Sequence, residues 1–333
     1  MNLFWILLGM AAAAAVLVLV IAYICFRMAF WSPARKPVGE EEYSIPKGKI
    51  YEPYRDAMIA WMKECRSTPH EDVSITSFDG LTLWGKYYER IPGAPIELMF
   101  HGYRGTAERD LCGGMQRCFA LGRNALIVEQ RASGRSGGNV ISFGVNESRD
   151  CLAWVDFMIG HFGPEVKIML TGISMGAATV LTAAGEKLPS NVFAVLADCG
   201  YTSAKAIIKK VIRDMKLPAD LSYPFVKLGA KLYGHFDLEE TSPVEAMKRC
   251  RVPVIFFHGE SDDFVPCEMS RENFQACVSP KRLVTVPGAG HGLSYMVDRE
   301  GYLEALAEFA ELCGVPAEKQ LVEKVISTSC CKF

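Results

Sequence analysis

The sequence contains no run of five or more residues of one charge, and its 36 basic residues nearly balance its 38 acidic ones. Nucleic-acid-binding domains typically concentrate Lys and Arg in one patch, so we expect no nucleic-acid partner. The sequence also lacks CxxC pairs and His/Cys clusters with metal-ligand spacing. Its 12 cysteines are scattered through a chain that is half apolar, so we interpret them mostly as reduced, buried residues. We therefore expect neither a disulfide framework nor a bound metal or organic cofactor.

No Lys or Arg precedes the first long apolar run, which covers residues 3–26 without a charge. These 24 residues are enough to cross a bilayer. The alternative, a cleaved signal peptide, has a basic n-region and a shorter apolar stretch. We therefore expect residues 1–31 to be a retained, single-pass transmembrane anchor. Because Arg27, Arg35 and Lys36 follow the run, the positive-inside bias places the rest of the chain in the cytoplasm.

Prolines are frequent in residues 32–70, where only a short periodic piece at residues 58–62 indicates a helix. We expect this segment to be a linker that tethers the anchor to one large domain at residues 71–315. Residues 316–333 are expected to form a C-terminal tail.

Within the large domain, short apolar runs alternate with segments of helical spacing. Two segments of period-two alternation flank Asp79-Gly80, which predicts a β-hairpin. Six further apolar runs lie at residues 96–100, 125–128, 168–171, 192–197, 254–257 and 283–286. Strands buried on both faces and separated by helices are typical of parallel sheets. The sequence therefore predicts an α/β fold with a doubly wound, mostly parallel, eight-stranded sheet.

One segment, residues 201–249, is too long to be a single crossover between strands. Pro218, Pro224 and Pro243 divide it into short helical pieces. Insertions of this kind typically lie over the mouth of an active site, so we expect a helical lid.

Ser174 lies in the segment Gly172-Ile173-Ser174-Met175-Gly176, which fits the G-x-S-x-G pattern of a nucleophile elbow. The segment follows the strand-like KIMLT and precedes the helix-prone AATVLTAA, which is the context the elbow requires. A small-residue turn with an ordinary serine is the alternative. The placement between strand and helix favours a nucleophile.

A serine hydroxyl needs a general base, and in folds with this elbow the acid and the histidine follow the serine along the chain. Three histidines follow Ser174, and His291 lies in a glycine-rich loop after the last predicted strand. His258 is at a strand end and is expected to serve packing. The acid is expected in the loop after the preceding strand, where Asp262 and Asp263 are adjacent candidates.

The oxyanion of an acyl-transfer intermediate is held by two backbone amides. One comes from the residue after the nucleophile, which is Met175. The other comes from the loop after the third strand, here His101-Gly102-Tyr103-Arg104-Gly105, and we assign it to Tyr103. We expect His101 itself to brace its loop rather than to transfer protons.

With these residues in place, the chain resembles the α/β-hydrolase superfamily over about residues 70–312. It is most similar to the membrane-anchored bacterial branch related to prolyl-oligopeptidase and serine-aminopeptidase domains. The matching segments are HGYRG at 101, EQRASGRSGG at 129, FGVNESRDCLAWVDF at 143, GISMG at 172, HGESDDFVP at 258 and GAGHG at 288. The segment from Glu129 departs from the family, which has an Asp-x-Arg-Gly-His-Gly run there. In the family the acid occupies a Gly-x-x-Asp-x-x-Val-Pro run, and this implies Asp262.

These residues predict a serine hydrolase that cleaves carboxylic esters, acyl or lipid-like, through an acyl-enzyme formed by Ser174, His291 and Asp262. A serine peptidase or aminopeptidase is the first alternative, and a non-catalytic membrane-bound binding module is the second. The expected partners are a small-molecule ester or short peptide and the membrane. The oligomeric state is not predicted. Removal of residues 1–31 is expected to leave a soluble, active domain.

Overall fold

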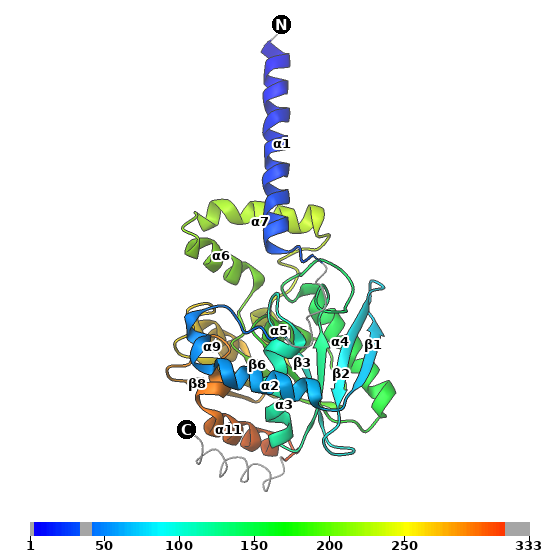
Figure 1. The fold of residues 1–333 in the computed structure, drawn as a ribbon. Helices are drawn as coiled ribbons and strands as arrows, with labels where there is room; N and C mark the ends of the chain where they lie inside the picture. The colour runs from blue at the N-terminus through cyan, green and yellow to red at the C-terminus, as the bar shows by residue number, and fades with distance from the viewer. Residues whose placement is uncertain (1–2, 34–41, 317–333) are drawn as a thin grey trace.

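The computed structural model describes residues 3–33 and 42–316 of the chain. Arg35, Lys36 and nearly all of the predicted C-terminal tail lie outside the described residues. The described part comprises one long N-terminal helix and an α/β body from which that helix projects (Figure 1).

The body is built on an eight-stranded sheet in the order β1-β2-β4-β3-β5-β6-β7-β8. β2 pairs antiparallel with β1 and β4, and all other neighbours pair parallel. The strands are β1 (Glu71–Thr76), β2 (Thr82–Tyr88), β3 (Ile96–Phe100), β4 (Asn124–Glu129), β5 (Ile168–Ile173), β6 (Val192–Asp198), β7 (Val254–Gly259) and β8 (Lys281–Val286). Both the hairpin and the six apolar runs of the sequence become strands. The expected eight-stranded α/β-hydrolase sheet is therefore confirmed.

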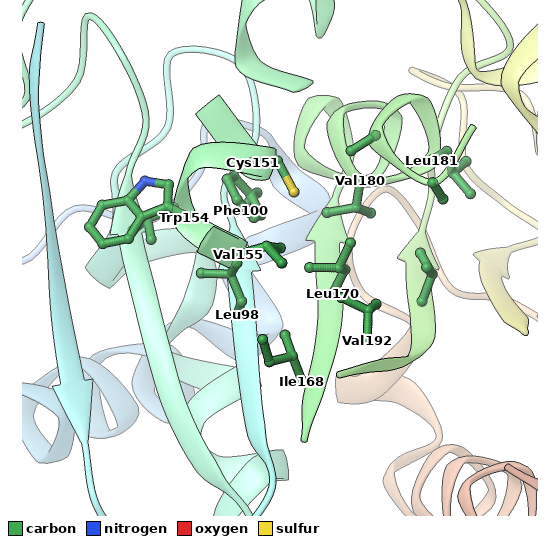
Figure 2. Packing of buried hydrophobic residues seen from close by; sticks show 14 of the residues in the cluster. Leu98, Phe100, Cys151, Trp154, Val155, Ile168, Leu170, Val180, Leu181 and Val192 are labelled. Carbon is green, nitrogen blue, oxygen red and sulfur yellow. The ribbon is translucent and has the colours of Figure 1, made fainter. Parts of the chain in front are cut away.

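Helices cover both faces of the sheet, as a doubly wound fold requires. The described helices are α1 (Leu3–Ala29), η1 (Lys49–Tyr54), α2 (Arg55–Ser67), α3 (Ala107–Ala120), α4 (Val145–Phe162), α5 (Met175–Ala183), α6 (Ala204–Asp214), α7 (Ala219–Tyr233), α8 (Pro243–Met247), α9 (Cys267–Ala276), α10 (Ser294–Val297) and α11 (Arg299–Leu312). On one face, Trp154 of α4 and Val180 of α5 pack against Leu98 and Leu170 of the central strands (Figure 2). On the other face, α2, α3 and α11 pack against the sheet.

The N-terminal helix α1 is long and apolar enough to span a membrane. Residues 3–20 are exposed, whereas Ala22, Phe26 and Phe30 are buried against the body. The chain then continues into the body, because the Ser32 hydroxyl donates to the Ala132 carbonyl at 3.0 Å. The end of the predicted anchor is therefore part of the core.

Residues 43–67 differ from the expected tether. α2 folds onto α3 and η1 packs against α2, and Met62 and Cys65 of α2 are buried in the same cluster as α3. The Arg66 guanidinium also pairs with the Glu108 carboxylate at 2.7 Å. Pro53 is tolerated because it precedes the first turn of α2 and removes no hydrogen bond from the helix interior. A linker is thus the wrong description of this segment, since it belongs to the body.

The described cysteines agree with the prediction that most cysteines are reduced and buried. All ten described cysteines are free, and seven of them are buried.

Candidate active site

Ser174 occupies the turn between β5, which ends at Ile173, and α5, which begins at Met175. Its backbone φ of 57° and ψ of −116° are strained for a non-glycine residue. The flanking glycines make this turn possible. A Cβ at Gly172 would lie 2.1 Å from the Gly176 carbonyl oxygen, and one at Gly176 would lie 2.0 Å from the Phe100 carbonyl oxygen. The elbow therefore requires glycine at both places and presents the serine at the carboxyl end of the sheet.

Ser174, His291 and Asp262 form a continuous chain of hydrogen bonds. His291 Nε2 lies 2.9 Å from Ser174 Oγ, and His291 Nδ1 lies 2.7 Å from Asp262 Oδ2. Asp262 follows β7 and His291 follows β8, so the parallel strands bring all three side chains to one edge of the sheet. This is the arrangement in which a histidine takes a proton from a serine while a carboxylate fixes its tautomer.

Asp262 is held as a carboxylate. Burial raises its pKa, but hydrogen bonds to His258 and His291, together with the electrostatic interaction with His291, lower the pKa by more, to well below its usual range. The backbone amides of Phe264 and Val265 also donate to Oδ1, at 3.0 and 2.8 Å. The carboxylate is thus fixed in place from both sides.

The neighbouring Asp263 is exposed, and the carboxylate bonded to His291 Nδ1 is that of Asp262. Its side chain does not cap α9. Asp263 is therefore an exposed residue that neither completes the triad nor caps a helix.

Two other histidines, His258 and His101, form hydrogen bonds that hold the surrounding loops in place. His258 is fully buried, and its Nδ1 lies 2.6 Å from Ser270 Oγ. Its Nε2 lies 2.8 Å from the Val265 carbonyl and 3.2 Å from Asp262 Oδ2, so it also supports the carboxylate. His101 Nδ1 lies 2.8 Å from the Gly102 carbonyl, and its Nε2 accepts the Gln130 amide at 3.1 Å.

The loop at residues 101–105 lies beside the serine, since a Cβ at Gly102 would be 3.6 Å from Ser174 Cβ. The Gly102 amide donates to Asp110 Oδ2 at 3.1 Å, and this fixes the loop. Tyr103 lines the cavity over Ser174, and Met175 is the first residue of α5, where the helix dipole favours negative charge. The structure therefore brings both assigned amide residues next to the serine.

This loop is also bonded to the end of α1. The Tyr103 hydroxyl donates to the Ala29 carbonyl at 2.7 Å. The Arg104 guanidinium donates to the carbonyls of Met28 and Trp31, each at 2.9 Å. The candidate oxyanion loop and the N-terminal helix are consequently coupled.

A cavity of about 670 Å³ opens above Ser174 and His291. Its wall includes residues 46–51, Met58, Tyr103, Arg109, Asp110, Asp263 and Phe264. No described residue of the insertion 201–249 lines it, so the expected lid is wrong for this cavity. The physical reason is that α7 packs against α1 and α8 packs against α5. The segment once expected to be a linker forms that wall instead.

Tyr51 is the functional candidate that sequence reasoning missed. It lines the cavity, and its hydroxyl donates to the His291 carbonyl at 2.9 Å. Tyr51 stands 240 residues before the histidine, in a segment without periodicity, so no local pattern indicates the contact.

Cys199, Asp262 and His291 are the group of potential metal ligands found among the described residues, with ligand atoms within 4.8 Å of one another. Burial raises the pKa of the Cys199 thiol well above its usual value, which disfavours the thiolate that binds metals. The atoms of Asp262 and His291 that face each other are already joined by a hydrogen bond. The donor set therefore fits a hydrogen-bonded triad better than a metal site.

Comparisons with known proteins give one family and several relatives. The sequence profile described as the prolyl oligopeptidase family matches residues 141–313. The Bacillus subtilis protein YqkD is 29% identical over 192 residues, which are 57% of this chain and 63% of YqkD, a little under two thirds of its length. Protein bem46 of Schizosaccharomyces pombe is 23% identical over 90% of this chain and 91% of its own. The structure of the Pyrococcus furiosus esterase Pf2001 superposes with a TM-score of 0.62 at 22% identity, covering 83% of this chain and 98% of the esterase.

Proposed function

The chain belongs to the prolyl oligopeptidase family, and we propose that it is a membrane-anchored serine esterase acting on acyl or lipid-like carboxylic esters. The hydrogen-bonded chain from Ser174 through His291 to Asp262 carries this proposal. Membership of the family supports a hydrolase in general, and the choice of esters depends on the surroundings of the triad.

The proposed reaction follows from the geometry. Ser174 Oγ attacks the ester carbonyl and passes its proton to His291 Nε2, while Asp262 stabilises the resulting imidazolium. The amides of Met175 and Tyr103 donate to the oxyanion. The C–O bond to the alcohol then breaks, and the alcohol leaves with the proton from Nε2. A water molecule, deprotonated by the same nitrogen, hydrolyses the acyl-enzyme and restores Ser174.

Two observations favour an acyl ester as substrate. The cavity wall includes the apolar side chains of Ile50, Met58 and Phe264, which suit an acyl chain. In addition, the loop that carries Tyr103 is bonded to the end of α1, so the site lies close to the proposed membrane anchor. A membrane-derived ester would be delivered at this end of the molecule.

A serine aminopeptidase is the second candidate. Asp110 and Asp263 line the same cavity, and a carboxylate there would pair with the α-ammonium group of a peptide. The basic side chains of Lys47, Lys49 and Arg109 lie on the same wall and oppose this pairing. A non-catalytic binding module is disfavoured, because such a module would not need the aligned triad.

The location of the protein is part of the proposal. Phe26 and Phe30 are buried in the body, so removal of α1 as a signal peptide would expose their apolar partners. We therefore favour a retained single-pass anchor over a cleaved signal. The basic residues after the span support a cytoplasmic body, and protease added outside intact cells should then leave the body intact.

A substrate panel tests the function. Full-length protein in detergent would be assayed against p-nitrophenyl acyl esters of increasing chain length and against amino-acid arylamides, with Ser174→Ala as the matched control. We expect turnover of the esters that is absent in the control. Turnover confined to the arylamides would replace the esterase proposal by the aminopeptidase one.

A further inference from the structure

Helix α7 carries two apolar faces, of which only one is needed for packing in the body. Ala219, Tyr223 and Val226 are buried against the body. A second set recurs at helical spacing on the other side of the helix and consists of Leu221, Phe225, Leu228 and Leu232. Leu221 is 68% exposed and Leu232 is 41% exposed. Phe225 and Leu228, which lie between them, are partly buried, so the stripe is exposed most at its two ends. Exposed apolar side chains that share one helix face mark an interaction surface.

Helix α1 sets the depth of this stripe relative to a bilayer. At about 1.5 Å per residue, about 20 residues cross the hydrocarbon core. Counted from Leu3, the span therefore ends close to Ala22. At this level α1 meets α7, because the Tyr233 hydroxyl donates to the Leu19 carbonyl at 3.2 Å. A Cβ at Gly229 would lie 2.4 Å from the Ala22 carbonyl oxygen, so the two helices are in close contact.

The orientation of α7 suits the membrane boundary. Figure 1 shows α7 running across the base of α1, between the projecting helix and the sheet. A helix that lies across a transmembrane helix at the end of its span lies along the membrane surface. Tyr23 and Tyr233 meet at the crossing with their ring centroids 5.2 Å apart, as aromatic residues do at membrane interfaces.

The turn between α6 and α7 extends the same surface. Met215 and Leu217 are 49% and 48% exposed. Arg213 and Lys216 are exposed basic residues beside Met215 and Leu217, and exposed Lys231 precedes Leu232 at the end of α7. Exposed apolar side chains flanked by basic ones are typical of helices that lie in the interface of anionic membranes.

We propose that the outer stripe of α7, together with Met215 and Leu217, inserts into the bilayer that α1 spans. These side chains would therefore contact the lipids at the boundary between the headgroups and the acyl chains. The inference rests on the proposed membrane anchor and goes beyond it, because it adds a second contact between the body and the membrane. α6 also reaches the active site, since the Lys210 ammonium donates to the Asp263 carbonyl at the cavity wall. The insertion therefore connects the lipid surface to the site without covering it.

Lipid-specific quenching tests the proposal on the full chain. A small fluorescent amino acid would be incorporated at position 221, 8 or 312, one at a time. Each protein would be reconstituted into vesicles of equal parts phosphatidylcholine and phosphatidylglycerol, with a nitroxide on some acyl chains. Leu8 lies in the exposed part of α1 and reports the anchor. Leu312 is an 82% exposed leucine at the end of α11, on the opposite side of the body from α1 (Figure 1). Position 232 serves as a second site on the stripe should position 221 not accept the label.

We expect quenching at positions 8 and 221 that is at least about threefold stronger than at position 312. Quenching at position 8 alone would overturn the proposed surface and leave the anchor standing. Quenching at none of the positions would overturn the anchor, and the proposed surface with it. If position 221 is protected from both the lipid nitroxide and a water-soluble quencher, a protein covers the stripe, and the proposal is wrong.

Discussion

Ser174 and His291 share one proton in the proposed mechanism, so neither is useful without the other. Ser174→Ala and His291→Ala should each lower kcat by about four to six orders of magnitude. The double substitution should cost little more than either single one, because the pair acts as a unit. Steady-state kinetics of the three variants check this, and additive losses would show that the wrong residues have been paired.

Asp262 and Asp263 provide a matched comparison at adjacent positions. Asp262→Asn should lower kcat by up to about four orders of magnitude, because an amide no longer fixes the productive tautomer of His291. Asp263→Asn should leave turnover nearly normal, since that side chain is exposed and Asp262 supplies the hydrogen bond to His291 Nδ1. A larger loss in Asp263→Asn, measured under identical conditions, would overturn the assignment.

At this scale the sequence was informative wherever function imposes a local motif. The elbow, the chain order and the glycine-rich loop were sufficient to predict that Ser174 and His291 come together, whereas the choice of Asp262 over Asp263 needed the family resemblance. The catalytic roles of these residues stay predictions. The contact of Tyr51 with His291 was not predictable, because it depends on how a distant segment folds over the site.

Among the elements, β3 carries the least expected interaction. Glu97 is fully buried on this strand and pairs with Arg117 of α3 at 2.6 Å and with Arg123 at 2.8 Å. Burial raises the pKa of Glu97, but the charges of Arg117 and Arg123 outweigh it and lower the pKa from 4.5 to about 2. The carboxylate thus joins β3, α3 and the start of β4 beneath the active site.

Glu97→Gln should therefore destabilise the protein at neutral pH by roughly 3–5 kcal/mol, since it leaves two buried cations without their partner. Because the folded pKa is depressed, the contribution of Glu97 is present above pH 4.5 and is lost as the pH falls towards 2. Denaturant unfolding of both proteins at several pH values checks the sign. A difference that stays constant or grows on acidification would contradict it.

Periodicity predicted the strands, but not all of the elements around them. The six buried runs and the hairpin are strong local signals, and each became a strand. η1 and α2 were interpreted as a linker because Pro53 and the mixed composition hide a helix that is stabilised mainly by packing on α3.

In the whole molecule, α1 belongs to two environments, and this changes the expected effect of truncation. Residues 3–20 are exposed, whereas Phe26 and Phe30 are buried in the body. Deleting residues 1–20 should preserve the fold. Deleting residues 1–31 should instead lower the free energy of unfolding by more than about 5 kcal/mol, because two buried phenylalanines are lost. Denaturation of both truncations in the same detergent measures this.

The earlier expectation of an active domain after removal of residues 1–31 would be restored if the two truncations proved equally stable. A matched control is the shorter truncation carrying Phe26→Ala and Phe30→Ala, which should approach the stability of the longer one. The insertion 201–249 was misplaced over the active site for the same reason, because the contact between α1 and α7 was not foreseen. The sequence pattern identified the insertion, but its position depends on that contact, which no local signal encodes.

The central claim is that the described site makes Ser174 a nucleophile, and covalent labelling tests it most directly. Full-length protein in detergent would be treated with a fluorophosphonate and the modified residue located by mass spectrometry, with Ser174→Ala as control. The serine oxygen should displace fluoride and form a bond to phosphorus, which gives a single modification at Ser174 that is absent from the control. A folded protein that does not label at Ser174, or that labels equally in the control, would contradict the account.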